Sequence, residues 1–198
     1  MALSRDRIVA AATGLIDREG LDALSARRLA AELGCEAMSI YHHVGNMGEL
    51  LNEVTNQALA ALPLPDPDST DPHGARRQLG RMARALLELA GSRPHLFRAI
   101  GTRRWRTPAE VAFQLRATEI FTRAGLGPRH ALRAARTLLV YLNGAGLALA
   151  AWALDQSAPV LETAPARRVF RGSSATSVAR DVDWGVETLL QALLPDGS

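Results

Sequence analysis

The sequence predicts an all-α protein of two domains. Apolar residues recur at spacings of three and four along nearly the whole chain, capping residues stand where these runs begin, and no alternating run indicates a strand. A stretch with four prolines and three aspartates at 62–73 interrupts the helical pattern. We therefore expect one domain over residues 1–62 and a second over 74–198.

The first domain is expected to begin with a helix whose apolar stripe is Ile8, Ala12, Leu15 and Ile16. Ser25 is placed to cap a second helix that ends at Gly34, and a short third helix is expected from about Ala37 to His43. Residues 25–44 thus have the layout of a helix-turn-helix, in which the second helix lies in the major groove of DNA.

Further start signals divide the rest of the chain into helices. A fourth helix is expected to open at Asn46, because Glu49 follows at the spacing of a capping box. Thr107, Pro108 and Glu110 form a stronger signal of the same kind. The second domain is expected to hold helices over 75–91, from 107 to about 125, over 128–154 and over 179–194, with a mobile loop over 157–178.

Charge is unevenly distributed along the chain. All 23 basic residues are arginine, and they face 20 acidic residues. Residues 1–62 carry five arginines against eight acids, whereas residues 76–136 carry fourteen arginines against three glutamates. Bulk charge therefore points to the middle of the chain, and a DNA-binding site in the first domain needs geometric support.

The compartment is expected to be the cytoplasm. The single cysteine, Cys35, excludes an internal disulfide and suits a reducing compartment, and the N-terminal residues lack the pattern of a signal peptide. Residues 137–154 are 18 residues without a charge, but they include Asn143, Gly144 and Gly146. A helix buried in a soluble core or a subunit interface explains this stretch better than a membrane span.

Residue identities narrow the helix-turn-helix to one family. The segment LSARRLAAELGCEAMSIYHHVGNMGELL, residues 24–51, resembles the TetR family of transcriptional repressors. It has a Ser-x-Arg helix start, then Leu-Ala-x-x-Leu-Gly, Tyr-x-His-Val and a capped helix with Leu-Leu. The resemblance implies a regulator that binds DNA as a homodimer and responds to a small-molecule effector.

The resemblance also implies which residues contact DNA. The family's contact positions carry, in this chain, Arg27, Ala37, Met38, Ser39, Tyr41, His42 and His43. Arg27 is expected to reach a guanine or a phosphate, and the cap residue Ser25 a phosphate. Where the family usually has a lysine at the start of the fourth helix, this chain has Met47, so one phosphate contact is missing and affinity or salt dependence should be lower than is usual for the family.

The two histidines allow two other interpretations. A metal site is disfavoured, because adjacent residues on a helix point about 100° apart and no Cys/His set completes a ligand shell. The alternative that either His42 or His43 lies partly buried against the first helix stays open.

The second domain more weakly resembles the tetracycline repressor branch of the family. The matches are Gly101-Thr102-Arg103, Gln114-Leu115 and Trp184-Gly185-Val186-Glu187. Ala99 stands in place of that branch's metal-chelating histidine, and Pro63 and Arg81 replace its ligand-binding His and Asn. A magnesium–tetracycline chelate is therefore not expected, and neither a cofactor nor a metal is predicted.

The residues of the second domain predict a helical pocket for a small molecule. Its apolar candidates are Met82, Leu86, Phe97, Phe113 and Leu115, and its polar candidates are Thr102, Arg103 and Gln114. Whether the apolar members line a pocket or only fill the core stays open. Arg103, Arg104 and Arg106 flank Trp105, where a solvated turn is favoured over an anion-binding site.

The dimer is predicted from the helices over 128–154 and 179–194, which carry more apolar surface than one domain covers. Gly144 and Gly146 are expected to permit close approach of a second chain. The expected stripe on the final helix is Val182, Val186, Leu189, Leu190 and Leu193. With two recognition helices about one DNA turn apart, the operator should be a palindrome.

An enzyme is not predicted. His73, His95 and His130 lie far apart in the sequence without a carboxylate and nucleophile set, and no phosphate-binding glycine loop is present. A small helical enzyme and an architectural DNA-binding protein without an effector remain the alternatives to a ligand-responsive repressor. The architectural protein is disfavoured, because DNA contact alone would not need so long a second domain.

Overall fold

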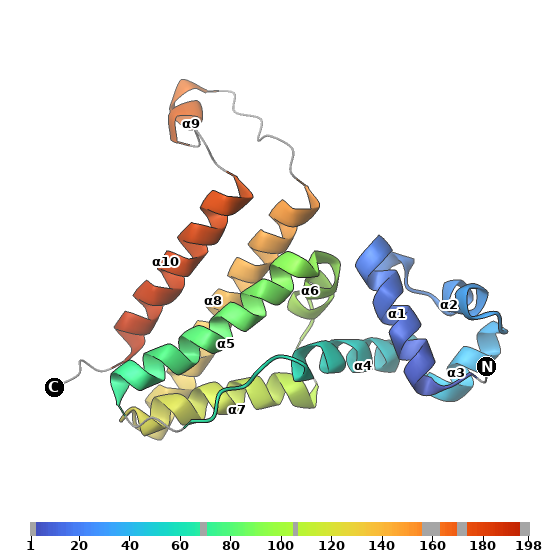
Figure 1. The fold of residues 1–198 in the computed structure, drawn as a ribbon, viewed down its shortest axis with the longest axis horizontal. Coiled ribbons are helices and arrows are strands. Elements are labelled where there is room, and N and C mark those ends of the chain that lie inside the picture. The colour runs from blue at the N-terminus through green and yellow to red at the C-terminus, as the bar shows by residue number, and fades with distance from the viewer. Residues whose placement is uncertain (1–2, 68–70, 105–106, 156–162, 170–173, 195–198) are drawn as a thin grey trace.

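The computed structural model describes residues 3–67, 71–104, 107–155, 163–169 and 174–194. Every element in these ranges is helical, which confirms the all-α prediction (Figure 1). In chain order they are α1 (Arg5–Glu19), the 3₁₀ helix η1 (Leu21–Ala23), α2 (Ala26–Leu33), α3 (Ala37–Val44), α4 (Met47–Ala60), α5 (Pro72–Ser92), α6 (Pro94–Gly101), α7 (Pro108–Arg123), α8 (Pro128–Leu154), α9 (Ala164–Val169) and α10 (Ala175–Leu193).

Helices α1 to α3, here called the head, lie at one end of the molecule, and α4 joins them to the body formed by α5 to α10 (Figure 1). The head has one apolar core, in which Leu15 of α1, Leu29 of α2 and Ile40 of α3 are fully buried. Ser25 caps α2 as predicted, because its hydroxyl accepts a hydrogen bond from the backbone nitrogen of Arg28 at 3.3 Å.

The start of α4 forms only half of the predicted capping box. Asn46 Oδ1 accepts from the backbone nitrogen of Glu49 at 2.9 Å, as expected. The return contact differs, because Asn46 also has an amide donor that serine and threonine lack, and its Nδ2 donates to Glu49 Oε1 at 2.8 Å. The backbone nitrogen of Asn46 donates instead to the carbonyl oxygen of Val44 at 2.9 Å.

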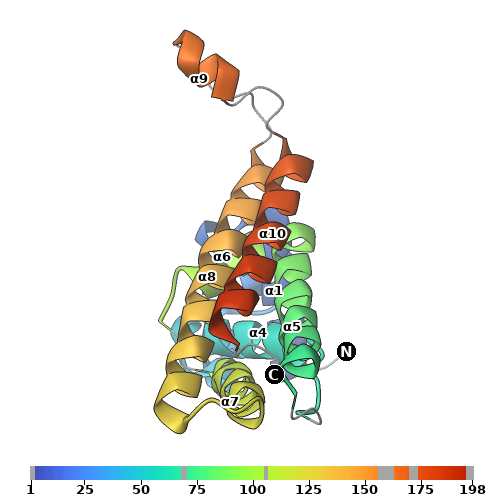
Figure 2. The same ribbon diagram turned by 90° about the vertical axis from the view of Figure 1, so that its left-hand side faces the viewer.

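Helix α8 is the centre of the body and packs against α5, α6, α7 and α10 (Figure 2). Gly146 lets α6 approach, since a Cβ at this position would collide with the ring of Phe97. By length and composition alone α8 could cross a membrane, but core helices of soluble proteins share these properties. Only 28% of its most apolar window is buried within the chain, so much of its surface is open to a partner.

Tyr141 fastens α10 to α8. Its hydroxyl donates to the carbonyl oxygen of Val182 at 3.2 Å. The phenol lies where a Cβ on Gly185 would be, so only glycine allows this approach. Burial, and to a lesser extent the carboxylate of Asp183, raises the pKa of Tyr141 above its ordinary value.

Some predicted boundaries were wrong for local reasons. α5 begins at Pro72 rather than near 75, because the side chain of Asp71 caps it by accepting from the backbone nitrogen of Gly74 at 2.8 Å. α6 was not predicted as a separate helix. α10 begins earlier than 179, at a capping box formed by Ser174 and Ser177. The predicted loop over 157–178 contains α9, while its residues 157–162 and 170–173 lie outside the described residues.

Candidate functional site

The outward face of α3 is the first candidate surface. Ile40 and Val44 are fully buried and fix which side of the helix faces the core. The opposite side presents Met38, which is 61% exposed, together with Tyr41, His42 and His43, all of them exposed. Neither histidine is buried against α1, so both imidazole groups are free to contact a partner.

Arg5 of α1 holds α3 in place. Its Nε donates to Glu53 Oε2 of α4 at 2.6 Å, and its Nη1 donates to the carbonyl oxygen of His43 at 2.9 Å. The carbonyl groups at a helix C-terminus lack partners within the helix, and a guanidinium there complements the helix dipole. Sequence reasoning missed Arg5, because its partners are 38 and 48 residues away and leave no local signal.

Helix α2 adds one arginine to this surface. Arg28 pairs with Glu19 at 2.6 Å, and Arg18 pairs with Glu32 at 3.1 Å. Arg27 is exposed and makes no ion pair with any residue that the structure describes. Of these three arginines, Arg27 is therefore the one whose charge is available for a phosphate or a base. Ala37 and Ser39 are half-buried at the edge of the surface.

In the body, four of the five apolar candidates for a pocket lie in the core. Met82, Leu86, Phe97 and Phe113 are all buried. The space between Leu86, Phe97 and Phe113 is a cavity of only about 10 Å³, which leaves room for no organic molecule. The close approach of Phe97 to α8 accounts for this tight packing.

The polar candidates are divided between two cavities. Arg103 and Gln114 line a cavity of about 390 Å³, whose other lining residues are Arg136, Leu139, Val140 and Asn143. Thr102 lines a separate cavity of about 250 Å³ between the end of α1 and α6, and its hydroxyl donates to the carbonyl oxygen of Arg98 at 2.7 Å. Leu115 is 64% exposed and lies outside both.

Arg103, which lines the larger of these two cavities, also contacts α4. Arg103 Nη2 donates to Asn52 Oδ1 at 2.7 Å. One turn further along α4, Asn56 Oδ1 accepts from the backbone nitrogen of Ala109 at 3.0 Å. Asn52 and Asn56 are four residues apart and therefore share one face of α4. Arg103, just after α6, and Ala109, at the start of α7, thus hold the helix that joins the head to the body.

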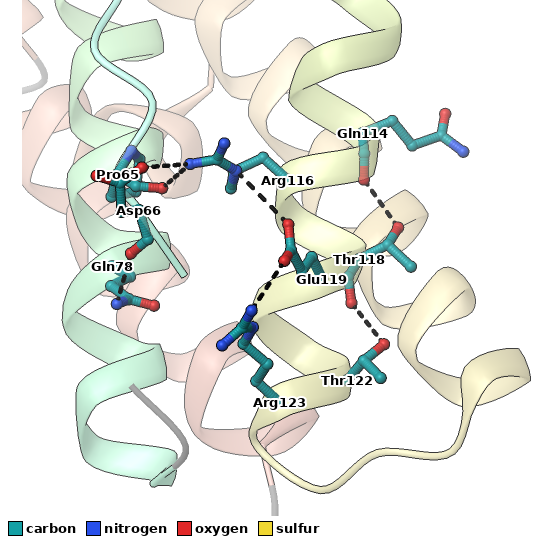
Figure 3. A network of polar contacts seen from close by, with 9 residues as sticks. All are labelled: Pro65, Asp66, Gln78, Gln114, Arg116, Thr118, Glu119, Thr122 and Arg123. Carbon is teal, nitrogen blue, oxygen red and sulfur yellow. Dashed lines mark hydrogen bonds and ion pairs between the residues drawn. The ribbon is translucent and has the colours of Figure 1, made fainter. Parts of the chain in front are cut away.

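The segment between α4 and α5 is fastened to the body as well (Figure 3). Arg116 of α7 donates through Nη1 to the carbonyl oxygen of Pro65 and lies 3.4 Å from Asp66 Oδ1. Gln78 of α5 is buried and donates through Nε2 to the carbonyl oxygen of Asp66 at 2.9 Å. The segment after α4 is therefore held by Arg116 and Gln78, as α4 itself is held through Asn52 and Asn56.

Both α8 and α10 leave apolar residues uncovered in the single chain. Val140 of α8 is 74% exposed and Trp184 of α10 is 72% exposed. The exposed residues Gly144, Ala148 and Ala151 continue the line of Val140 along α8 at helical spacing. Large exposed apolar side chains beside small ones mark a surface that a partner covers.

The predicted dimer stripe on α10 was partly wrong. Leu190 is 0% exposed, and Val182 and Val186 are buried as well, because this side of α10 packs on α5 and α8 of the same chain. Gly146 likewise serves a contact within the chain. Gly144 has open space beside it and remains available for a second chain.

Among the described residues, no group of three or more His, Cys, Asp or Glu side chains is placed to hold a metal ion. Ala99, which stands where the tetracycline repressor branch has a chelating histidine, is buried.

Comparison with known proteins decides the family. The family model described as "Bacterial regulatory proteins, tetR family" matches residues 8–54, which include α2, α3 and most of α1 and α4. The HTH-type transcriptional repressor DrrR1 of Streptomyces coeruleorubidus is 42% identical over 94 residues, 48% of this chain and 34% of that protein. Residues 8–54 belong to the TetR family.

Other members of the TetR family match nearly the whole chain. Tetracycline repressor protein class E of Escherichia coli is 27% identical over 197 residues, covering 95% of this chain and 89% of that protein. ActR of Streptomyces coelicolor, in its complex with actinorhodin, has a TM-score of 0.78 at 27% identity and covers 98% and 97% of the two chains. These relatives are regulators, which agrees with the prediction that the chain is not an enzyme.

Proposed function

We propose that the chain is a transcriptional repressor that binds a palindromic operator as a homodimer and is released by a small-molecule effector. The observation that carries the proposal is the composition of the outward face of α3. This short helix is held in the head by its buried side and by Arg5, and its exposed side chains are Met38, Tyr41, His42 and His43. A short, firmly seated helix with polar side chains outward suits insertion into a major groove.

Each side chain of this surface has a contact that suits its chemistry. Arg27 would bind a guanine edge or a phosphate, and the Ser25 hydroxyl a phosphate. Tyr41, His42 and His43 would hydrogen-bond phosphates and base edges, with Ser39 at the margin. Ala37 and Met38 would pack against thymine methyl groups. Since residues 1–62 are acidic overall, affinity would depend on these few contacts rather than on bulk charge.

The uncovered surface that carries Trp184 of α10 and Gly144, Ala148 and Ala151 of α8 would form the dimer interface. Helices α8 and α10 of each chain would pair with their two-fold mates in a four-helix arrangement. The two α3 helices would then lie about 34–36 Å apart, the spacing of successive major grooves on one side of DNA.

The division of labour would follow the predicted domains. Residues 1–62 would bind DNA, and residues 74–198 would dimerise and bind the effector in the cytoplasm. The cavity beside Arg103 supports a sensor, because the side chain that lines it also holds α4. An effector would act by favouring one separation of the two heads, which requires different affinities for the bound and free arrangements. An architectural DNA-binding protein without an effector would not need a residue that links a cavity to α4.

Fluorescence anisotropy with the DNA upstream of the protein's own coding sequence tests the proposal. Arg27→Ala should weaken binding by about 1–3 kcal/mol at fixed salt. Arg77→Ala removes the same charge from an exposed site on α5 and should leave affinity unchanged. Wild-type protein that binds this DNA no better than an unrelated sequence of equal length would contradict the proposed function.

A further inference from the structure

We propose that the cavity lined by Arg103 and Arg136 binds an organic carboxylate, whose negative group these two arginines hold and whose apolar body lies on Leu139 and Val140. The inference rests on the proposed function, because it gives the chemical class of the proposed effector. It concerns the cavity of about 390 Å³, which falls within the size range of small-molecule sites.

The charge of the cavity is uncompensated. In the described part of the chain, its lining contains two arginines and no acidic residue. Neither Arg103 nor Arg136 forms an ion pair with a residue that the structure describes, whereas Arg116 and Arg123 on neighbouring α7 share Glu119. Two guanidinium groups without a carboxylate, beside a shared hollow, are a site for an anion from outside the chain.

The remaining lining indicates what the anion is attached to. Leu139 and Val140 offer an apolar wall, and Gln114 and Asn143 offer amide groups. Gln114 extends from α7 away from Arg116, so its amide is not engaged with the segment that Arg116 holds (Figure 3). An apolar wall with a few polar groups suits an aromatic or aliphatic body with one charged end.

Inorganic phosphate fits the cavity less well. Phosphate sites usually combine cationic side chains with the free backbone N–H groups of a helix N-terminus. Gln114 and Arg136 lie seven and nine positions into α7 and α8, where backbone N–H groups are already bonded within the helix. The positive charge in the cavity therefore comes from side chains alone, and the cavity also has apolar surface that a phosphate ion would leave without a contact.

Arg103 also connects this site to the head. Its guanidinium donates to the neutral amide oxygen of Asn52 on α4 at 2.7 Å. A carboxylate is a charged acceptor that can take two parallel hydrogen bonds from a guanidinium, whereas the amide oxygen of Asn52 is a neutral acceptor, so a carboxylate in the cavity would compete with Asn52 for Arg103. Occupancy of the cavity would thereby loosen α4 from the body.

The test is calorimetric titration of the full chain with sodium 2-naphthoate and with its uncharged counterpart 2-naphthamide. The acid should bind at least about tenfold more tightly than the amide. Arg136→Gln should abolish most of this preference. Arg129→Gln removes the same charge from an exposed site in the first turn of α8, outside the cavity lining, and should preserve the preference.

A second variant tests the connection to α4. Asn52→Ala frees Arg103 and should increase affinity for 2-naphthoate about fivefold, because one competing hydrogen bond is lost. Decreased affinity would contradict the competition between Asn52 and the ligand.

Three results would overturn the proposal: equal binding of acid and amide, an unchanged preference in Arg136→Gln, or no binding of either probe up to about 1 mM. Inorganic phosphate that competes fully with 2-naphthoate would also overturn it, since the apolar body would then contribute nothing. None of these titrations contains DNA. Failure of the DNA-binding proposal is therefore seen separately, in the anisotropy measurement.

Discussion

Arg93 at the start of α6 and Asp17 near the end of α1 form an ion pair between body and head, with Arg93 Nη2 2.6 Å from Asp17 Oδ2. Nε of the same arginine lies 3.2 Å from both carboxylate oxygens. Both side chains are about two-thirds buried, so solvent screens the pair only in part. Together with the Asn52 contact, this pair fixes the angle at which the head leaves the body.

We expect a coupling energy of about 1 kcal/mol between Arg93 and Asp17. The measurement is a double-mutant cycle of Arg93→Gln and Asp17→Asn by urea unfolding. A matched cycle on the exposed pair Arg18–Glu32 should give a smaller value. Equal coupling in the two cycles would mean that the Arg93 pair does not hold the head.

Tyr41→Ala and His43→Ala should each weaken operator binding by about 1–3 kcal/mol, because each removes a side chain from the outward face of α3. Helicity and thermal stability should stay the same, since neither side chain packs in the core. Anisotropy at one fixed salt concentration measures the first effect and circular dichroism the second. Lost stability with unchanged affinity would assign these residues a structural role instead.

Met47→Lys should add one phosphate contact at the first residue of α4. The slope of log affinity against log salt should steepen by about one unit. The gain should be similar on operator and unrelated DNA, because phosphate contacts do not read bases. A salt series with both DNAs measures this. An unchanged slope would place the start of α4 away from the backbone.

Trp184→Glu should produce monomers, because it places a charge on the uncovered surface of α8 and α10. Sedimentation velocity at micromolar concentration measures the change, with Val111→Glu on α7 as a matched exposed control that should remain dimeric. Leu190 is unsuitable for this test, since a charge there would disrupt the fold of the single chain. A wild-type monomer, or an unaltered Trp184→Glu dimer, would move the interface elsewhere.

Stability should fall at high pH through Tyr141. Its pKa is raised on folding, so folding favours the neutral phenol; this contribution is complete below the unfolded pKa of about 10 and is lost as pH rises through the folded pKa. Tyr141→Phe should therefore flatten the decline in unfolding free energy above about pH 10. Urea unfolding across that range, with Tyr41→Phe on exposed α3 as control, measures the difference. Parallel curves for wild type and Tyr141→Phe would contradict it.

Elements with strong local signals could be predicted from the sequence. The bounds of α8 matched, because Pro128 at its first position and a long uncharged run leave little ambiguity. The residues on the outward face of α3 had been named from the family resemblance, and Ile40 and Val44 are buried on the other side of the helix. α6 escaped prediction because eight residues directly after another helix give too short a pattern for periodicity to separate.

Features made by distant residues could not be predicted. Arg136 appeared only as one of fourteen arginines in a basic stretch, and nothing local distinguishes it from Arg129 or Arg133. Its place on the cavity depends on how α7 packs against α8. Phe97 was a candidate either to line a pocket or to fill the core, and the close approach at Gly146 places it in the core.

The hydrogen bonds that hold α4 to the body restrict where the DNA-binding head of this chain can be exchanged for that of another regulator. A hybrid protein made by grafting a foreign head onto this body inherits a body surface already shaped to receive the amides of Asn52 and Asn56. A splice point placed after α4 discards both amides and leaves Arg103 and the backbone nitrogen of Ala109 without their acceptors. A splice point before Asn52 keeps them, so hybrids joined there should retain effector control that hybrids joined after α4 lose.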